Sequence, residues 1–269
     1  MNLKDFYKGN LFDCYNFFGA HKENDEFIFR TYAPTAKEVM IFGSFNDWKE
    51  EEMKKDEGGI FLFKTNKASF GDMYKYVIYS KDGHRYEHCD PYGFGMELRP
   101  AFASYITDSD EYRFTDERWL KNRTKNFNSP MNIYELHLGS WKTHNNQWYN
   151  YSELADILIP YVKENHYTHI EFMPISEHPA DCSWGYQNTG FFSPTSRYGK
   201  ASQLMELIDK CHNADIGVIL DFVPVHFAVD GYALARYDGT YLYEYPPSDV
   251  GISEWGTCNF NHAKGETRS

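Results

Sequence analysis

The sequence predicts a chain of two parts, an antiparallel β-sandwich followed by three β-α steps of a parallel sheet. Between residues 26 and 108, short stretches with a two-residue apolar period are separated by Gly, Asn, Asp and Pro, which is typical of a sandwich. After Pro130, apolar strands alternate with helical spacings, which indicates βαβ units. The last strand, 217–220, runs without polar alternation into Asp221, as a strand buried on both faces does.

The sandwich is expected to span residues 21–115, after a short helical lead-in at residues 1–20. Its strands are predicted at 27–30, 39–42, 60–64 and 74–79. Residues 116–130 are polar and highly charged, with Trp119 as the main apolar anchor, and this composition predicts a linker.

The second part, 131–269, is expected to contain strands at 132–140, 168–174 and 217–221. Ser152 is the predicted N-cap of the first connecting helix, and Ser202 opens the second. No clear helix or strand pair is expected after Asp221. A closed barrel needs eight strands, so these three steps form either a small open sheet or the front end of a larger fold.

Composition narrows the class of ligand and the cellular setting. The chain carries 27 Lys and Arg against 39 Asp and Glu, a net charge of −12, which excludes nucleic acid and anionic membrane as main partners and favours a neutral ligand. Its five cysteines show no CxxC spacing, so we expect neither disulfides nor a zinc site. No secretory leader or membrane span is visible. The sequence therefore predicts a cytoplasmic protein without a metal or cofactor, and it indicates no oligomeric state.

The candidate site residues lie where parallel folds place their chemistry. Asp221 and His226 follow the buried strand at 217–220, and the long loop at 177–199 carries further polar and aromatic groups. Aromatic side chains beside a carboxylate, an imidazole and an amide can bind a polyhydroxylated ligand by stacking and hydrogen bonding. The aromatic content of 18% agrees with this interpretation. The alternative is structural: a strand-end Asp capping a turn, a packed His, and aromatic side chains holding the loop down. The loop residues of interest are Trp184, Tyr186 and Gln187.

Several motifs, in order along the chain, resemble those of 1,4-α-glucan (glycogen) branching enzymes of the α-amylase superfamily. In the second part, the motifs lie at 133–141, 173–179, 184–187, 194–199 and 219–227. In the first part, the segments 33–36, 45–48 and 90–100 resemble the glucan-binding β-sandwich module that precedes the barrel in these enzymes. The resemblance implies that the parallel part is the beginning of a TIM (β/α)8 barrel, left incomplete in this chain.

The resemblance also implies roles for individual residues toward an α-1,4-glucan or glycogen. Asp221 and His226 match the residues that hydrogen-bond the sugar next to the cleaved bond, and Tyr186 matches the tyrosine that stacks on that sugar. We place Trp184 and Gln187 in the same substrate-binding set. Four positions depart from the family pattern and put fine specificity in question: Ala180, Cys182, Phe222 and Val225.

The resemblance assigns no catalytic residue to this chain. The family's nucleophilic aspartate and its acid/base glutamate would lie beyond Ser269, so the 269-residue chain is expected to be inactive by itself. Two other functions stay open: a non-catalytic glucan-binding fragment, and a related debranching or trehalose-releasing enzyme. In the first of these, Trp48 is a candidate sugar-binding residue, although a tryptophan at the end of a sandwich strand more often belongs to the core. We also expect residues 1–115 to fold independently and 131–269 to be only marginally stable.

Overall fold

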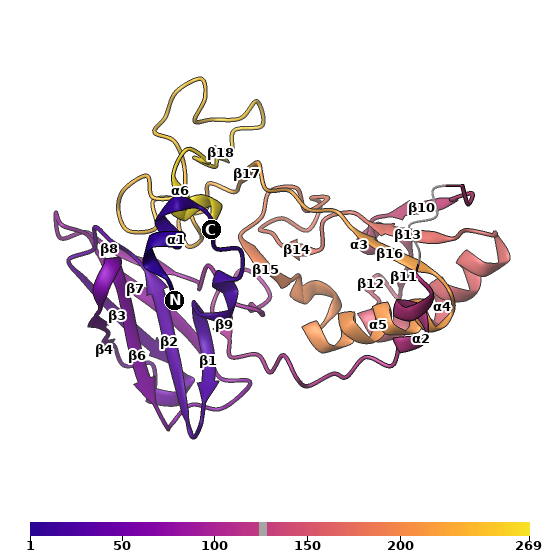
Figure 1. Ribbon diagram of the computed structural model, residues 1–269, viewed down its shortest axis with the longest axis horizontal. Helices are drawn as coiled ribbons and strands as arrows, with labels where there is room; N and C mark the ends of the chain where they lie inside the picture. The colour runs from indigo at the N-terminus through magenta and orange to yellow at the C-terminus, as the bar shows by residue number, and fades with distance from the viewer. Residues whose placement is uncertain (124–127) are drawn as a thin grey trace. The chain divides into compact units, whose positions relative to one another are not determined.

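The computed structural model describes residues 1–123 and 128–269 (Figure 1). The chain forms two compact units, and each draws on segments that are distant in sequence. The first unit contains Met1–Thr107, Ser176–Ser193 and Pro224–Ser269, and the second contains Asp108–Ile175 and Pro194–Val223. The domain boundaries expected from the sequence, after residues 20, 115 and 130, stay predictions.

The first unit is built on two antiparallel sheets, as the sequence predicts (Figure 1, indigo to purple). The first sheet has the order β1-β2-β6-β5, and the second has the order β4-β3-β7-β8, with β9 also paired to β7. Each predicted strand corresponds to an observed one, with ends shifted by a few residues. The strands of the first sheet are β1 (Gly19–Glu23), β2 (Glu26–Tyr32), β5 (Lys54–Lys55) and β6 (Ile60–Thr65). Those of the second are β3 (Glu38–Gly43), β4 (Glu51–Glu52), β7 (Met73–Tyr79), β8 (Arg85–His88) and β9 (Ser104–Tyr105).

Short elements complete the first unit. Helix α1 (Leu3–Lys8) is the predicted lead-in helix; Asn2 caps its N-terminus, and Gly9 ends it with a left-handed φ of 71°. The remaining elements are η1 (Cys14–Asn16), η2 (Ser44–Asn46), η3 (Glu57–Gly59), β14 (Ser176–Glu177), β15 (Gly190–Pro194), β17 (His226–Phe227), β18 (Cys258–Asn259) and α6 (Gly265–Arg268). The pair β17-β18 and helix α6 were not expected from the sequence, because each involves only two to four residues of weak pattern.

The sandwich core is completed by the segment 224–269. Phe227 and Tyr237 are fully buried in the same apolar cluster as Phe29 and Tyr74 of the strands. The Tyr237 hydroxyl lies 2.7 Å from the Thr31 hydroxyl, and both groups are buried. Apolar side chains from beyond residue 224 therefore fill part of this core, and the independent folding of residues 1–115 stays a prediction.

Polar contacts bind the same segment to the sandwich. The Asp238 carboxylate accepts hydrogen bonds from the Thr35 backbone at 3.1 Å and from its hydroxyl at 2.7 Å. The Ser269 hydroxyl donates to the Phe6 carbonyl oxygen at 2.9 Å. Because Asp238 is almost fully buried, its hydrogen bonds compensate for the cost of removing it from water.

The second unit contains a parallel three-stranded sheet in the order β10-β13-β16, which is the predicted start of a barrel. Its strands are β10 (Ile133–Leu136), β13 (His169–Phe172) and β16 (Gly217–Leu220). Helices α4 (Tyr151–Glu164) and α5 (Ala201–Asn213) form the crossovers, and their apolar faces pack in one core with the strands. Smaller elements are α3 (Leu138–Trp141), β11 (Thr143–His144), β12 (Gln147–Trp148) and η4 (Ser196–Tyr198).

Helix α4 begins two residues earlier than predicted. Asn150, not Ser152, is the N-cap: its side chain accepts from the Glu153 backbone at 2.9 Å, and the Glu153 carboxylate accepts from the Asn150 backbone at 3.0 Å. Ser152 instead donates to Glu206 of α5. The sequence 150–153 offers two cap residues, and the reciprocal pairing with Glu153 selects Asn150.

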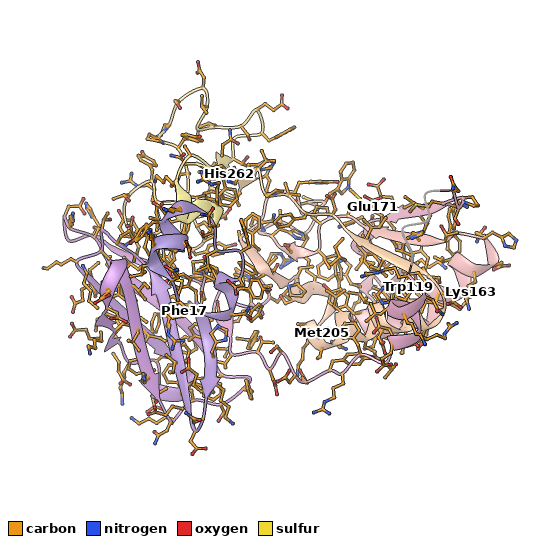
Figure 2. All side chains as sticks on the ribbon, in the orientation of Figure 1. Phe17, Trp119, Lys163, Glu171, Met205 and His262 are labelled. Atoms are coloured by element: carbon orange, nitrogen blue, oxygen red, sulfur yellow. The ribbon has the colours of Figure 1, made fainter. Side chains whose placement is uncertain are left out.

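The expected linker spans residues 116–130, and its first half contains secondary structure and packs against α5. It contains helix α2 (Glu117–Asn122), and Asp116 pairs with the His212 ring at 2.6 Å. Trp119, labelled in Figure 2, stacks on the same ring with centroids 5.1 Å apart. The segment is therefore anchored to α5 through His212. Residues 124–127 of the expected linker lie outside the described residues.

No helix among residues 1–123 and 128–269 is both long and apolar enough to cross a membrane.

Candidate functional site

In the second unit, the carboxyl ends of the three parallel strands place polar groups at one edge of the sheet. Leu136, Phe172 and Leu220 are in register across β10, β13 and β16. Asp221 follows β16 directly, and its backbone N–H donates to the Phe172 carbonyl at 3.1 Å. The half-buried Asp221 is thus held at the strand end where parallel folds bind ligands.

His137 follows β10 at the same edge, and sequence reasoning assigned it no role. Burial lowers the pKa of His137, and the positive charge of Arg197 lowers it further, so the imidazole is neutral near pH 7. Its Nδ1 lies 3.0 Å from the Ser140 hydroxyl. The strand register is the signal that associates His137 with Asp221. The predicted strand 132–140 missed it, because β10 ends at Leu136 and α3 follows from Leu138.

In the first unit, His226 lies on β17, paired across the ladder with Asn259 of β18. Its side chain is only 6% exposed, and burial lowers its pKa, which favours the neutral imidazole. Within the described parts of the chain, the buried Nδ1 of His226 has no hydrogen-bond partner. The imidazole therefore keeps one buried ring nitrogen that the described residues leave without a hydrogen bond.

The loop that carries the other predicted residues runs beside the segment following His226. The Ala228 backbone donates to the Asn188 carbonyl oxygen at 3.0 Å. Upstream of Asn188, Tyr186 and Gln187 are half-buried, while Trp184 is 61% exposed. Gly185, between the two aromatic residues, has a left-handed φ of 91°, and its N–H donates to the Ser183 hydroxyl at 3.1 Å. This turn needs glycine, because other residues rarely adopt that φ.

Four of the five predicted site residues therefore belong to the first unit: Trp184, Tyr186, Gln187 and His226. Asp221 belongs to the second unit. The roles assigned to these five residues stay predictions. Trp255, which sequence reasoning did not assign, forms a ring pair with His226 at a centroid distance of 5.5 Å.

Across residues 1–123 and 128–269, no group of three or more His, Cys, Asp or Glu side chains is arranged to hold a metal ion. All five cysteines are free thiols. The described candidate residues of the first and second units therefore offer a ligand carboxylate, imidazole, amide and aromatic groups.

Both parts of the chain match known domain families. Residues 17–93 match carbohydrate-binding module 48 (isoamylase N-terminal domain), and residues 141–238 match the α-amylase catalytic domain. Among curated proteins, the 1,4-alpha-glucan branching enzyme GlgB of Fusobacterium nucleatum is 45% identical over 98% of this chain and 44% of its own length. The resemblance to glucan branching enzymes is confirmed. The enzyme of the same name from Francisella tularensis is also 45% identical, over 98% of this chain and 43% of its own length.

Solved structures agree on the fold. A putative α-amylase from Salmonella typhimurium has a TM-score of 0.75 at 23% identity, covering 94% of this chain and 40% of that one. A pullulanase from Paenibacillus barengoltzii has a TM-score of 0.77 at 21% identity, covering 98% of this chain and 46% of that one. The chain therefore combines a β-sandwich that matches carbohydrate-binding module 48 with part of an α-amylase-type barrel fold, and it spans about 44% of the length of the F. nucleatum relative.

Proposed function

We propose that this chain contributes the glucan-binding module and the first part of the catalytic domain of a 1,4-α-glucan branching enzyme. The observation that carries the proposal is the 45% identity to enzymes of that name over 98% of the chain. Asp221 at the strand end of the second unit and the aromatic and polar groups of the first unit support it, because they can hydrogen-bond or stack on a neutral sugar. The net charge of −12 also favours a neutral ligand.

In this proposal the reaction is a double displacement. A carboxylate attacks the anomeric carbon of an α-1,4 bond and forms a covalent glycosyl intermediate, while the rest of the chain leaves with a 4-hydroxyl protonated by a general acid. The 6-hydroxyl of another glucan chain then gives its proton to the same acid/base and displaces the carboxylate, which forms the α-1,6 bond. In the second unit, Asp221 hydrogen-bonds a sugar of the glucan. In the first unit, His226 hydrogen-bonds a sugar and Tyr186 stacks on one. Trp184 and Gln187 bind the glucan nearby. The neutral state of His226, which burial favours, lets one ring nitrogen donate while the other accepts.

We further propose that the 269-residue chain does not catalyse transfer by itself, because no described residue matches the nucleophile or the acid/base of the family. Asp221 is a substrate-binding residue in this account. The protein is proposed to act in glycogen synthesis in the cytoplasm, where its glucan substrate would be made.

The test combines binding and activity on one purified sample. We expect the chain to be retained by amylose, with no new α-1,6 branches by iodine staining and linkage analysis. Absence of retention would overturn the glucan proposal. Branch formation would show that the chain contains its own nucleophile, and Asp221→Asn would then be the first variant to assay. Release of maltotriose from pullulan would instead favour a debranching enzyme.

A further inference from the structure

We propose that Trp255 is a sugar-binding platform next to His226, and that it stacks on a glucose unit of the bound α-1,4-glucan. The inference rests on the proposed glucan substrate and adds to it a residue that neither the sequence motifs nor the family matches assign. Three features of the first unit carry it: the exposure of the indole, the rigid turn that holds it, and its ring contact with His226.

Trp255 is 64% exposed, which is unusual for the residue with the largest apolar side chain. It lies at the tip of a short hairpin, 252–258, which an isolated bridge between Ile252 and Cys258 closes. A tryptophan at such a tip gains little from burial in the fold. Its exposed face is therefore available to a ligand.

The hairpin tip is fixed by hydrogen bonds around Ser253. The Ser253 hydroxyl accepts from the Trp255 backbone at 3.2 Å and from the Thr257 backbone at 3.2 Å. The Ser253 backbone donates to the Thr257 carbonyl at 2.9 Å, and the two hydroxyls lie 2.5 Å apart. These bonds fix the backbone that carries Trp255, so a ligand that stacks on the indole has less of the turn to order on binding.

The hairpin also fixes Trp255 relative to His226. The ladder between β17 and β18 pairs His226 with Asn259, directly after the hairpin. The indole and imidazole rings lie 5.5 Å apart between centroids, at an angle of 35°. A sugar stacked on the indole would thus lie beside an imidazole whose Nδ1 finds no partner in the described residues. Stacking and hydrogen bonding from adjacent groups are what recognition of a sugar ring requires.

The charges on the hairpin and directly upstream of it select against anionic ligands. Glu254 directly precedes Trp255 and is exposed, and the exposed Asp249 lies a few residues upstream. These carboxylates would repel a phosphate or a nucleic acid and leave a neutral saccharide as the favoured occupant.

The experiment follows each tryptophan separately in the full chain. The six tryptophans are labelled with 5-fluorotryptophan, the Trp255 signal is assigned from Trp255→Phe, and maltoheptaose is titrated while ¹⁹F NMR spectra are recorded. We expect the Trp255 signal to shift with saturation, while Trp119, stacked on His212 in the second unit, stays unchanged. In parallel, Trp255→Ala should weaken maltoheptaose binding by roughly 3- to 10-fold. Phe12→Ala, which removes another aromatic ring that is 75% exposed in the first unit, should leave the affinity unchanged.

The outcomes separate this inference from the proposed function. Saturable binding with shifts of other tryptophans but none of Trp255, or equal affinities of wild type and Trp255→Ala, would overturn the platform and leave the glucan proposal standing. If the wild-type chain binds no maltoheptaose, both fall together. A Trp255 shift with a matching loss of affinity in Trp255→Ala supports both.

Discussion

The segment 224–269 is predicted to stabilise the whole sandwich, and Phe227→Ala tests this directly. Phe227 is fully buried, its ring centroid lies 4.6 Å from that of Phe260, and it shares one apolar cluster with the sandwich strands. Truncating a buried phenylalanine costs about 3–5 kcal/mol through lost transfer free energy and the cavity left behind. Because a domain is stabilised by only about 5–15 kcal/mol, this loss is a large fraction of the total.

The assay is urea unfolding combined with native-state hydrogen exchange of the backbone amides of β2, β6 and β7. Phe227→Ala should lower the free energy of unfolding reported by these strands by about 3–5 kcal/mol, although Phe227 lies far from them in sequence. The same substitution at the exposed Phe12 should change it by less than about 0.5 kcal/mol. The reasoning fails if Phe227→Ala removes protection only within 224–269 and leaves the amides of β2 and β7 as protected as in the wild type.

Two further predictions concern a cap and a buried histidine. Asn150→Ala should lower the free energy of unfolding of the second unit by about 1 kcal/mol because it removes the cap of α4, and Asn150→Ser should restore most of it; equal thermal midpoints for all three proteins would contradict this. Burial lowers the pKa of His88 from 6.5 to about 4, so the unfolded state binds its proton more readily. The stability that His88 contributes is full above pH 6.5 and falls as pH drops toward 4, by up to roughly 3 kcal/mol. Urea unfolding at pH 7 and pH 5 should show a steeper loss for wild type than for His88→Gln, and parallel losses would contradict the assignment.

The strands could be predicted because their local patterns agree with their environment. In β3, buried Val39 and Ile41 alternate with half-buried neighbours, so the two-residue period is visible in the sequence. In β16, the apolar run ends at Asp221 as the sequence predicts, but the expected burial of both faces is wrong, because Leu220 is 46% exposed and Val218 and Ile219 are only half-buried. The cap of α4 was misassigned because Asn150 and Ser152 are both good cap residues, and only the reciprocal bonds with Glu153 distinguish them.

The return of residues 224–269 to the sandwich could not be predicted. Its elements are too short for a periodic signal, and its buried residues, such as Phe227 and Tyr237, meet partners about 200 residues away in sequence. The site residues likewise divide into those that a local pattern predicts and those that depend on distant pairing. Asp221 was identified from the strand that precedes it, whereas the pairing of Trp255 with His226 depends on a ladder between two-residue strands.

The central claim is that this chain binds an α-1,4-glucan through Asp221. It is tested most directly by isothermal titration of maltoheptaose into wild type, Asp221→Asn and the control Asp110→Asn, which changes an exposed carboxylate of the same unit. Loss of a charged acceptor costs about 1.5–3 kcal/mol, so we predict affinity at least about tenfold weaker for Asp221→Asn and unchanged for Asp110→Asn. Equal affinities of wild type and Asp221→Asn, or no binding by the wild type, would contradict the account.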